Sequence, residues 1–230
     1  RNNLEGFATV LEACRRNPPR HLVFASSSSV YGAGAKPPFR EDDDANQPVS
    51  YYGATKRANE LMAYSYAHNH RLNVTGLRFF TVYGPWGRPD MMMWIFTKKI
   101  LEGTPIPVFN HGDMYRDFTF IDDIMAGVIA SLDNPPADDG EVKAGGSTKP
   151  HRLYNIGNHQ PVELMDFIGT LERVLGREAK KNFLPMQPGD VPVTYADTDD
   201  LRRDVGFAPS TPLSQGLQHW ADWYRSYVSR

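Results

Sequence analysis

The sequence predicts an α/β protein built around the C-terminal half of a doubly wound parallel sheet, with a smaller α/β domain attached. Residues 1–80 alternate between helical and strand-like patterns, as a parallel sheet with crossover helices requires. A serine run, Ser26 to Ser29, directly follows an apolar stretch of strand length, and ligand sites in such sheets gather at the carboxyl ends of strands. After Tyr83 the sequence becomes richer in turns and shorter elements, which indicates a second domain.

The first four elements follow from periodicity and from the residues that end them. Residues 3–16 are expected to form a helix, because apolar side chains recur at helical spacing until two prolines prevent its continuation. The apolar run 21–25 reads as a strand, and 72–80 as another. Ser50 can cap a helix over 51–70. The side chains expected to face inward from that helix are Ala54, Ala58, Leu61 and Met62.

Beyond residue 83 the same reasoning gives shorter elements. A helix is expected over 91–101, and another over 122–132 with two aspartates in its first turn, where the helix dipole favours negative charge. The run 134–150, rich in Pro, Gly and Asp, is the best candidate for a mobile loop. The remaining expected elements are an extended piece over 106–109, a strand over 153–156, a helix striped by Leu164 to Val174, a strand over 182–184, a turn over 187–190 and a final helix carrying Leu213 to Tyr227.

Composition excludes several classes of protein. A formal net charge of -2 leaves no electrostatic footprint for nucleic acid or an anionic membrane. No apolar run approaches the roughly 18 residues that a spanning helix needs. The single cysteine, Cys14, excludes a disulfide within the chain and favours a reducing, cytoplasmic compartment.

Tyr52 and Lys56 are the first candidates for chemistry. Residues four apart share one face of a helix, so the Lys56 ammonium can stabilise a Tyr52 phenolate and make the tyrosine a general base. A serine hydroxyl from the preceding strand end could steady the same reacting oxygen. The spacing alone also fits an exposed Tyr/Lys pair, and the serine run is what favours the catalytic interpretation.

An acidic run and a glycine-containing segment are not interpreted as binding sites. The acidic run 41–44 is expected to be a solvated loop, and no metal site is expected. A glycine-rich turn between a strand and a helix, which would hold a dinucleotide pyrophosphate, is missing from this sequence. Gly32-Ala33-Gly34 does not supply one, because prolines at 37 and 38 occupy the place where the helix should begin.

With these residues assembled, the chain resembles the extended short-chain dehydrogenase/reductases of the sugar-nucleotide epimerase/dehydratase group, with a Rossmann-like NAD-binding domain. The segments that carry the resemblance are 24–32 (FASSSSVYG), 77–85 (LRFFTVYGP), 116–123 (RDFTFIDD) and 154–157 (YNIG). Within that group, 84–91 (GPWGRPDM) and 184–191 (LPMQPGDV) are most similar to the UDP-glucuronate 4-epimerases.

The resemblance implies a role for each motif residue. Tyr52 is implied as the base, Ser27 as its hydroxyl partner, and Lys56 as a contact of the nicotinamide ribose as well. The NAD contacts that it implies are Asn2 or Asn3, Ser26, Tyr52, Lys56 and the backbone near Phe79. The UDP-sugar contacts that it implies are Ser28, Ser29, Thr81, Arg88, Phe109, Arg116 and Asp190.

The chemistry expected is NAD-dependent C4 epimerisation of a UDP-uronic acid through a 4-keto intermediate. Arg116 is the expected bidentate clamp for the diphosphate, with a structural salt bridge as the alternative. Related dehydratases and decarboxylases carry Asp or Glu after the catalytic hydroxyl, whereas Ser28 and Ser29 stand here. Hydroxyls can bind a sugar carboxylate without repelling it, so the substrate is expected to keep its carboxyl group.

Two alternative functions remain open on the sequence. The first is another NAD-dependent UDP-sugar epimerase or a UDP-glucuronate decarboxylase. The second is a non-catalytic UDP-binding fragment, because the glycine-rich NAD turn is missing.

The sequence is interpreted as part of a longer enzyme. Residues 1–83 would be a partial NAD-binding domain to which 117–157 returns, and 84–116 with 158–230 would bind the UDP-sugar. An open sheet edge is then expected beside the strand 21–25. Members of the resembled group are usually homodimers that pair through the helix carrying Tyr52 and the helix before it.

Overall fold

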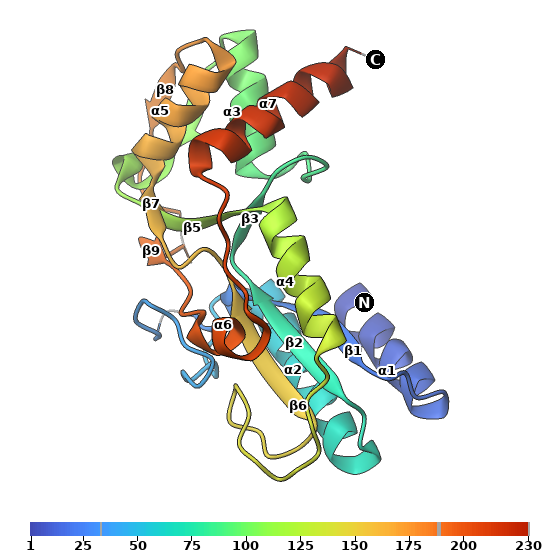
Figure 1. Cartoon of the computed structure of the whole chain (residues 1–230). Coiled ribbons are helices and arrows are strands. Elements are labelled where there is room, and N and C mark those ends of the chain that lie inside the picture. Colours follow the sequence, from blue (N-terminus) through green and yellow to red (C-terminus); the bar gives the residue numbers. More distant parts are fainter. Residues whose placement is uncertain (33, 188–189, 230) are drawn as a thin grey trace.

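A computed structural model describes residues 1–32, 34–187 and 190–229 (Figure 1). The Gly32-Ala33-Gly34 segment and the expected turn over 187–190 therefore lie partly outside the described residues, at Ala33, Pro188 and Gly189. The helices are the π-helical turn η1 (Asn2–Gly6), α1 (Phe7–Arg16), the 3-10 turn η2 (Ser28–Val30), α2 (Tyr51–His70), α3 (Met92–Glu102), the 3-10 turn η3 (Phe109–Gly112), α4 (Ile121–Asp133), α5 (Leu164–Leu175), α6 (Asp199–Val205) and α7 (Leu213–Val228). The strands are β1 (Leu22–Ser27), β2 (Val74–Phe79), β3 (Thr81–Tyr83), β4 (Ile106–Val108), β5 (Tyr115–Phe120), β6 (His151–Ile156), β7 (Pro161–Glu163), β8 (Lys181–Phe183) and β9 (Val193–Thr194).

A parallel sheet in the order β1-β2-β6 forms the base of the molecule (Figure 1). All residues of β6 are buried, as expected for a strand covered on both faces. On one face, Phe24 and Val74 pack against α1 and α2, and on the other Leu77 and Ile156 pack against α4 and α6. The predicted α/β class with a Rossmann-like parallel sheet is confirmed.

The parallel register places the carboxyl ends of β1, β2 and β6 side by side. Ser27 of β1 lies opposite Phe79 of β2, and Phe79 lies opposite Ile156 of β6. The serine run, the segment leading into β3 and the start of the loop after β6 therefore meet at one edge of the sheet.

The upper part of the molecule is built around a separate apolar core. The strands β3 and β5 pair in parallel, β7 and β9 extend this sheet, and β4 pairs with β8. The helices α3, α5 and α7 gather around a core that includes Phe96, Phe167 and Trp220 (Figure 1). The proposed division into an NAD-binding and a substrate-binding domain stays a prediction. None of the described helices combines the length and the apolar character that crossing a bilayer requires.

The inward face predicted for α2 is wrong at Ala54 and Leu61. Ala58 is half-buried, and Met62 packs against the core beside the parallel sheet. Leu61 is 55% exposed and Ala54 is also exposed, whereas Thr55, Asn59 and Glu60 are buried. These polar side chains can lie inside because partners from distant segments satisfy them: Asn3 contacts Thr55 and Asn59, and Arg78 contacts Glu60. Hydrophobic periodicity alone cannot anticipate such partners.

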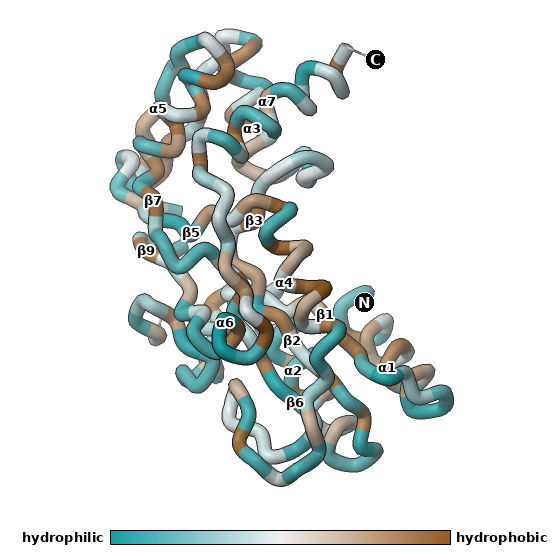
Figure 2. The backbone as a smooth tube through the Cα atoms, in the orientation of Figure 1, coloured by the Kyte–Doolittle hydropathy of each residue, from teal (hydrophilic) through white to brown (hydrophobic). Residues whose placement is uncertain are grey.

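The open edge predicted beside residues 21–25 is confirmed for the described part of the chain, where β1 pairs with β2 alone. Next to it, α4 exposes Met125, Ile129 and Leu132, which recur at helical spacing on one side. Figure 2 shows hydrophobic residues along α4 and the neighbouring β1. An unpaired strand edge and an apolar helix face therefore lie beside each other.

Candidate active site

The start of α2 lies directly against the serine run. Ser50 caps the helix as predicted, because its Oγ accepts a hydrogen bond of 2.9 Å from the backbone N–H of Gly53. A Cβ atom at Gly53 would overlap the carbonyl oxygen of Ser29. Glycine at this position therefore lets the helix approach the serines more closely than any other residue could.

Lys56 connects Tyr52 to the strand that carries the serines. Its Nζ donates a hydrogen bond of 3.1 Å to the carbonyl oxygen of Ala25 and lies 5.8 Å from the centre of the Tyr52 ring. Burial lowers the pKa of Lys56. Tyr52 is 48% exposed, so its ring is open to solvent while its neighbour is fixed to the sheet.

The serines adopt distinct roles in the local structure. Ser27 caps η2: its Oγ accepts a hydrogen bond of 3.2 Å from the Ser29 backbone N–H and lies 3.2 Å from the Ser29 Oγ. Ser26 points into the interior, where its hydroxyl donates to Glu60 over 2.6 Å. A hydrogen bond from Ser26 to a cofactor would therefore have to come from its backbone.

The other residues predicted to contact NAD lie on either side of this helix and strand pair. Asn3 of η1 donates from Nδ2 to Thr55 Oγ1 over 3.0 Å, and its carbonyl accepts from Asn59 Nδ2 over 2.6 Å. Asn2 is exposed on the same turn. Phe79 ends β2 in register with Ser27.

A cavity of about 290 Å³ opens beside the serine run. It is lined by most of the residues predicted to bind the UDP-sugar. Those predicted residues are Ser28, Ser29, Thr81, Arg116 and Asp190. They come from η2, β3, β5 and the segment before β9, so the cavity lies between the parallel sheet and the upper part of the molecule.

Arg116 enters this cavity already partnered. Its Nη2 donates to Asp190 Oδ1 over 2.8 Å, and its Nη1 donates to the carbonyl oxygens of Tyr115 and Pro192 over 2.9 and 3.0 Å. Both the structural salt bridge and the cavity position expected for Arg116 are therefore present. An anion that binds here must share the guanidinium with Asp190 or displace it.

Arg88 and Phe109 do not line the cavity. Arg88 lies in the loop after β3 and forms a bidentate pair with Asp90 at 3.0 and 2.5 Å. The pKa of Arg88 lies above its ordinary value, mainly because of this pair with Asp90. Phe109 begins η3 and packs at the margin of the upper core.

Sequence reasoning missed Asp117, although it quoted the segment that contains it. Asp117 is fully buried and accepts backbone N–H groups of Asn158, His159 and Ala196 over 2.5, 3.1 and 2.9 Å. Burial raises the pKa of this carboxyl, and the three donors oppose the rise. Asp117 therefore joins β5 to the loop after β6 and to the segment after β9, next to Arg116. The available signal was an acidic residue directly before the aromatic positions Phe118 and Phe120 in a segment of strand length.

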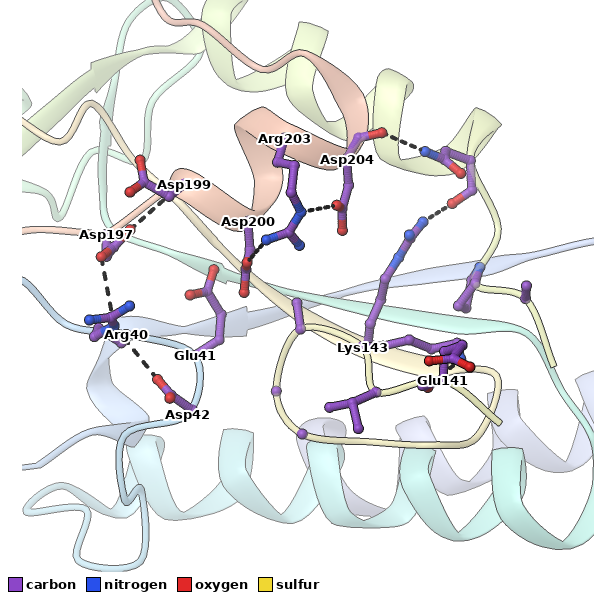
Figure 3. A pocket seen from close by; sticks show the side chains of 18 of the residues that line it. Arg40, Glu41, Asp42, Glu141, Lys143, Asp197, Asp199, Asp200, Arg203 and Asp204 are labelled. Carbon is purple, nitrogen blue, oxygen red and sulfur yellow. Dashed lines mark hydrogen bonds and ion pairs between the residues drawn. The ribbon is translucent and has the colours of Figure 1, made fainter. Parts of the chain in front are cut away.

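A larger hollow lies elsewhere in the described structure. A cleft of about 940 Å³ is bounded by residues 40–42, the loop 134–146 and α6, and none of the predicted site residues lines it. Figure 3 shows Arg203 between Asp200 and Asp204, and Arg40 between Asp42 and Asp197. Carboxylates outnumber cationic side chains around this cleft, which makes it a poor site for an anionic ligand.

Comparison with known proteins points to one family. The model of the NAD dependent epimerase/dehydratase family matches residues 1–157. The chain is 47% identical over 233 residues to UDP-glucuronate 4-epimerase 4 of Arabidopsis thaliana, with 99% of the chain and 53% of that protein covered. It is 45% identical over 228 residues to a probable UDP-glucuronate 4-epimerase of Rhizobium meliloti, with 96% of the chain and 67% of that protein covered.

Solved structures show the same likeness. The crystal structure of UDP-glucuronic acid 4-epimerase from Bacillus cereus in complex with UDP-glucuronic acid and NAD superposes with a TM-score of 0.85 at 33% identity, covering 98% of this chain and 68% of that one. The chain thus spans about half the length of the plant relative and about two thirds of the bacterial proteins.

Proposed function

The chain belongs to the NAD-dependent epimerase/dehydratase family, and we propose that it supplies the catalytic and sugar-nucleotide-binding part of a UDP-glucuronate 4-epimerase. The reaction would convert UDP-glucuronate into UDP-galacturonate, so the protein would be an isomerase. The observation that carries the proposal is the position of Lys56, which lies near the Tyr52 ring and bonds to the strand that carries the serine run. The cavity beside that run is lined by Arg116.

The described residues fit one part of an NAD molecule. Lys56 and the end of β1 lie together at the carboxyl edge of the parallel sheet, where dinucleotides bind in such folds. Lys56 and Tyr52 would hold the nicotinamide ribose there. The described residues contain no glycine-rich turn between a strand and a helix, so the pyrophosphate has no cradle of that kind within them.

The residues of the chain divide the proton chemistry between them. When bound, NAD would accept a hydride from C4 of the sugar and return it to the opposite face, leaving a 4-keto sugar between the two transfers. Tyr52 takes the proton of the C4 hydroxyl and later gives it back. Because the hydride also returns to the sugar, no net oxidation results. Lys56 stabilises the phenolate, and the Ser27 hydroxyl donates a hydrogen bond to the reacting oxygen.

The cavity residues account for a uronic acid substrate. Ser28 and Ser29 offer hydroxyl groups where a carboxylate would repel that of the sugar. Arg116 binds the diphosphate, whose binding energy is remote from C4 and can be used to orient the sugar. Arg88, in the loop after β3, would have to release Asp90 before it could bind the sugar.

Incubation with UDP-glucuronate and NAD tests the proposal. We expect UDP-galacturonate to accumulate, as followed by proton nuclear magnetic resonance, with no release of carbon dioxide. Tyr52→Phe should lose at least about 100-fold in kcat, because the general base is removed. Tyr51→Phe, which alters the adjacent exposed tyrosine, is the matched control and should retain activity. Release of carbon dioxide would instead identify a decarboxylase.

A second candidate function is binding of a UDP-sugar without catalysis. It is supported by the missing glycine-rich turn in the described residues. Calorimetric titration separates the two candidates: heat on addition of UDP-glucuronate but none on addition of NAD, together with no turnover, supports the binding function. Binding of both ligands together with turnover supports the epimerase.

A further inference from the structure

A buried carboxylate ties the catalytic helix to the catalytic strand. Glu60 of α2 accepts a hydrogen bond of 2.6 Å from the hydroxyl of Ser26, the residue before Ser27. The same carboxylate accepts two hydrogen bonds from Arg78 of β2, from Nε over 2.9 Å and from Nη2 over 3.0 Å. Arg57 adds one more from the outer side, over 2.9 Å.

Arg78 also reaches the far end of the serine segment. Its Nη1 donates to the Tyr31 hydroxyl over 2.9 Å and to the carbonyl oxygen of Glu41 over 3.2 Å. The Tyr31 hydroxyl in turn donates to Asn155 Oδ1 over 2.6 Å. The segment 26–31, which holds Ser27, Ser28 and Ser29, is therefore fixed at both ends through one guanidinium group.

Stability alone does not account for this arrangement. The side chains of Arg78 and Glu60 are 2% and 1% exposed, and desolvation of two charges offsets much of their attraction. Burial acts to raise the pKa of Glu60, but the hydrogen bonds and charge of Arg78 outweigh it, so this pKa lies below its ordinary value and the carboxylate is charged. Apolar residues of similar size would serve the core as well, which leaves geometric specification as the role of the pair.

The spacing along α2 places Glu60 on the same helix face as the residues proposed for catalysis. Tyr52, Lys56 and Glu60 follow at intervals of four residues and so share one face of the helix. Lys56 bonds to the carbonyl of Ala25, and Glu60 bonds to the hydroxyl of Ser26. Helix and strand are thus joined at Ala25 and Ser26, the two strand residues directly before Ser27.

We propose that Glu60 and Arg78 are positioning residues for the epimerase reaction, holding the serine segment 26–31 at a fixed distance from the Tyr52 and Lys56 face of α2. This inference rests on the proposed function. Neither residue lines the cavity beside the serine run. They act on the chemistry through Ser26, Tyr31 and the register between α2 and β1.

The experiment compares three variants with the unaltered chain. Glu60→Met combined with Arg78→Met replaces the buried pair by apolar side chains, a change that folded proteins tolerate. Ser26→Ala removes only the strand's bond to Glu60. Arg57→Met is the matched control, because it also removes a donor to Glu60 but leaves the contacts to the strand intact. Each is measured for kcat and KM with UDP-glucuronate, for thermal unfolding, and for hydrogen exchange of the peptide 25–32.

The expected result separates positioning from folding. The double variant should retain its thermal transition and a KM within about threefold, while kcat falls on the order of 100-fold and exchange in 25–32 quickens. Ser26→Ala should lower kcat about tenfold, and Arg57→Met should leave kcat unchanged.

Other results overturn the inference or the proposed function separately. A folded double variant with unaltered kcat and unaltered exchange shows that the pair positions nothing. If the double variant does not fold, Ser26→Ala decides alone, and unaltered kcat with unaltered exchange refutes the role. Absence of turnover by the unaltered chain refutes the proposed function instead, and the inference falls with it.

Discussion

Acidification should destabilise the fold through His151, at the start of β6. Its side chain is buried, with the residue 4% exposed, and neither ring nitrogen has a hydrogen-bond partner among the described residues. The ring lies edge-on to Tyr64, with 5.5 Å between ring centres. Burial lowers the pKa of His151 from 6.5 to about 4, with Glu60 acting to raise it and Arg78 and Arg57 to lower it.

The sign and size of the effect follow from linkage. Above pH 6.5 the ring is neutral in both states, so His151 contributes nothing to the pH dependence. As the pH falls from 6.5 to about 4, the unfolded chain binds a proton that the folded chain does not, and stability is lost. At about 1.4 kcal/mol for each pKa unit, the full loss is about 3 kcal/mol.

The assay is urea unfolding of the unaltered chain and of His151→Phe at intervals between pH 7.5 and 4. Groups that titrate elsewhere cancel in the difference, so the variant should gain about 3 kcal/mol relative to the unaltered chain as the pH falls through this window. His68→Gln, on the exposed surface of α2, is the matched control and should keep the pH dependence of the unaltered chain. A stability difference between His151→Phe and the unaltered chain that stays constant from pH 6.5 to 4 would refute the reasoning.

Three further changes test other parts of the structure. Burial raises the pKa of Glu41 to about 8, so the folded chain keeps a proton that the unfolded chain loses above pH 4.5. The folded state therefore loses stability as the pH rises from 4.5 to about 8. Glu41→Gln should remove this loss, as measured by urea unfolding at about pH 5 and 8. Gly53→Ala should push α2 away from the Ser29 carbonyl and lower kcat on the order of 100-fold with UDP binding retained, and an unchanged kcat would contradict the close approach. Asp117→Asn should lower the free energy of unfolding by about 1–3 kcal/mol, because an amide nitrogen cannot accept the backbone N–H bonds that a carboxylate oxygen accepts, and equal stability in urea would contradict this.

The long helices were predicted well, but for different reasons. Apolar spacing identified α5, whose buried side chains include Leu164, Phe167 and Leu171, whereas α2 was identified by its length and its cap although its inward face was partly wrong. The helix over 51–70 matches α2, and its Ser50 cap forms as expected. The strands β3, β7 and β9 and the short helix α6 were not predicted. Each is short, and β7 contains a proline, so these segments adopt their conformation because a neighbouring strand or loop is already in place.

The sequence identified which residues belong to the candidate site, but it did not show which partners hold them there. The sequence names Arg116, yet only the structure shows that Asp190 and two backbone carbonyls already hold its guanidinium. Glu60 gives no signal at all in the sequence, because a glutamate on a helix is ordinarily exposed. Its burial depends on Arg78, which the parallel register of β1 and β2 places opposite Ser26.

Charge, and not size, decides which hollow can hold the proposed substrate. A UDP-uronate carries a diphosphate and a carboxylate, and the acidic cleft of about 940 Å³ would repel both. The smaller cavity of about 290 Å³ offers serine and threonine hydroxyls and the Arg116 guanidinium instead. Asp190 is the exception, because its carboxylate lies where an anion would bind. The Asp190 carboxylate therefore favours a ligand whose phosphate or ribose groups can replace the hydrogen bonds of Arg116 or Asp190. Small anions that offer a single contact are disfavoured.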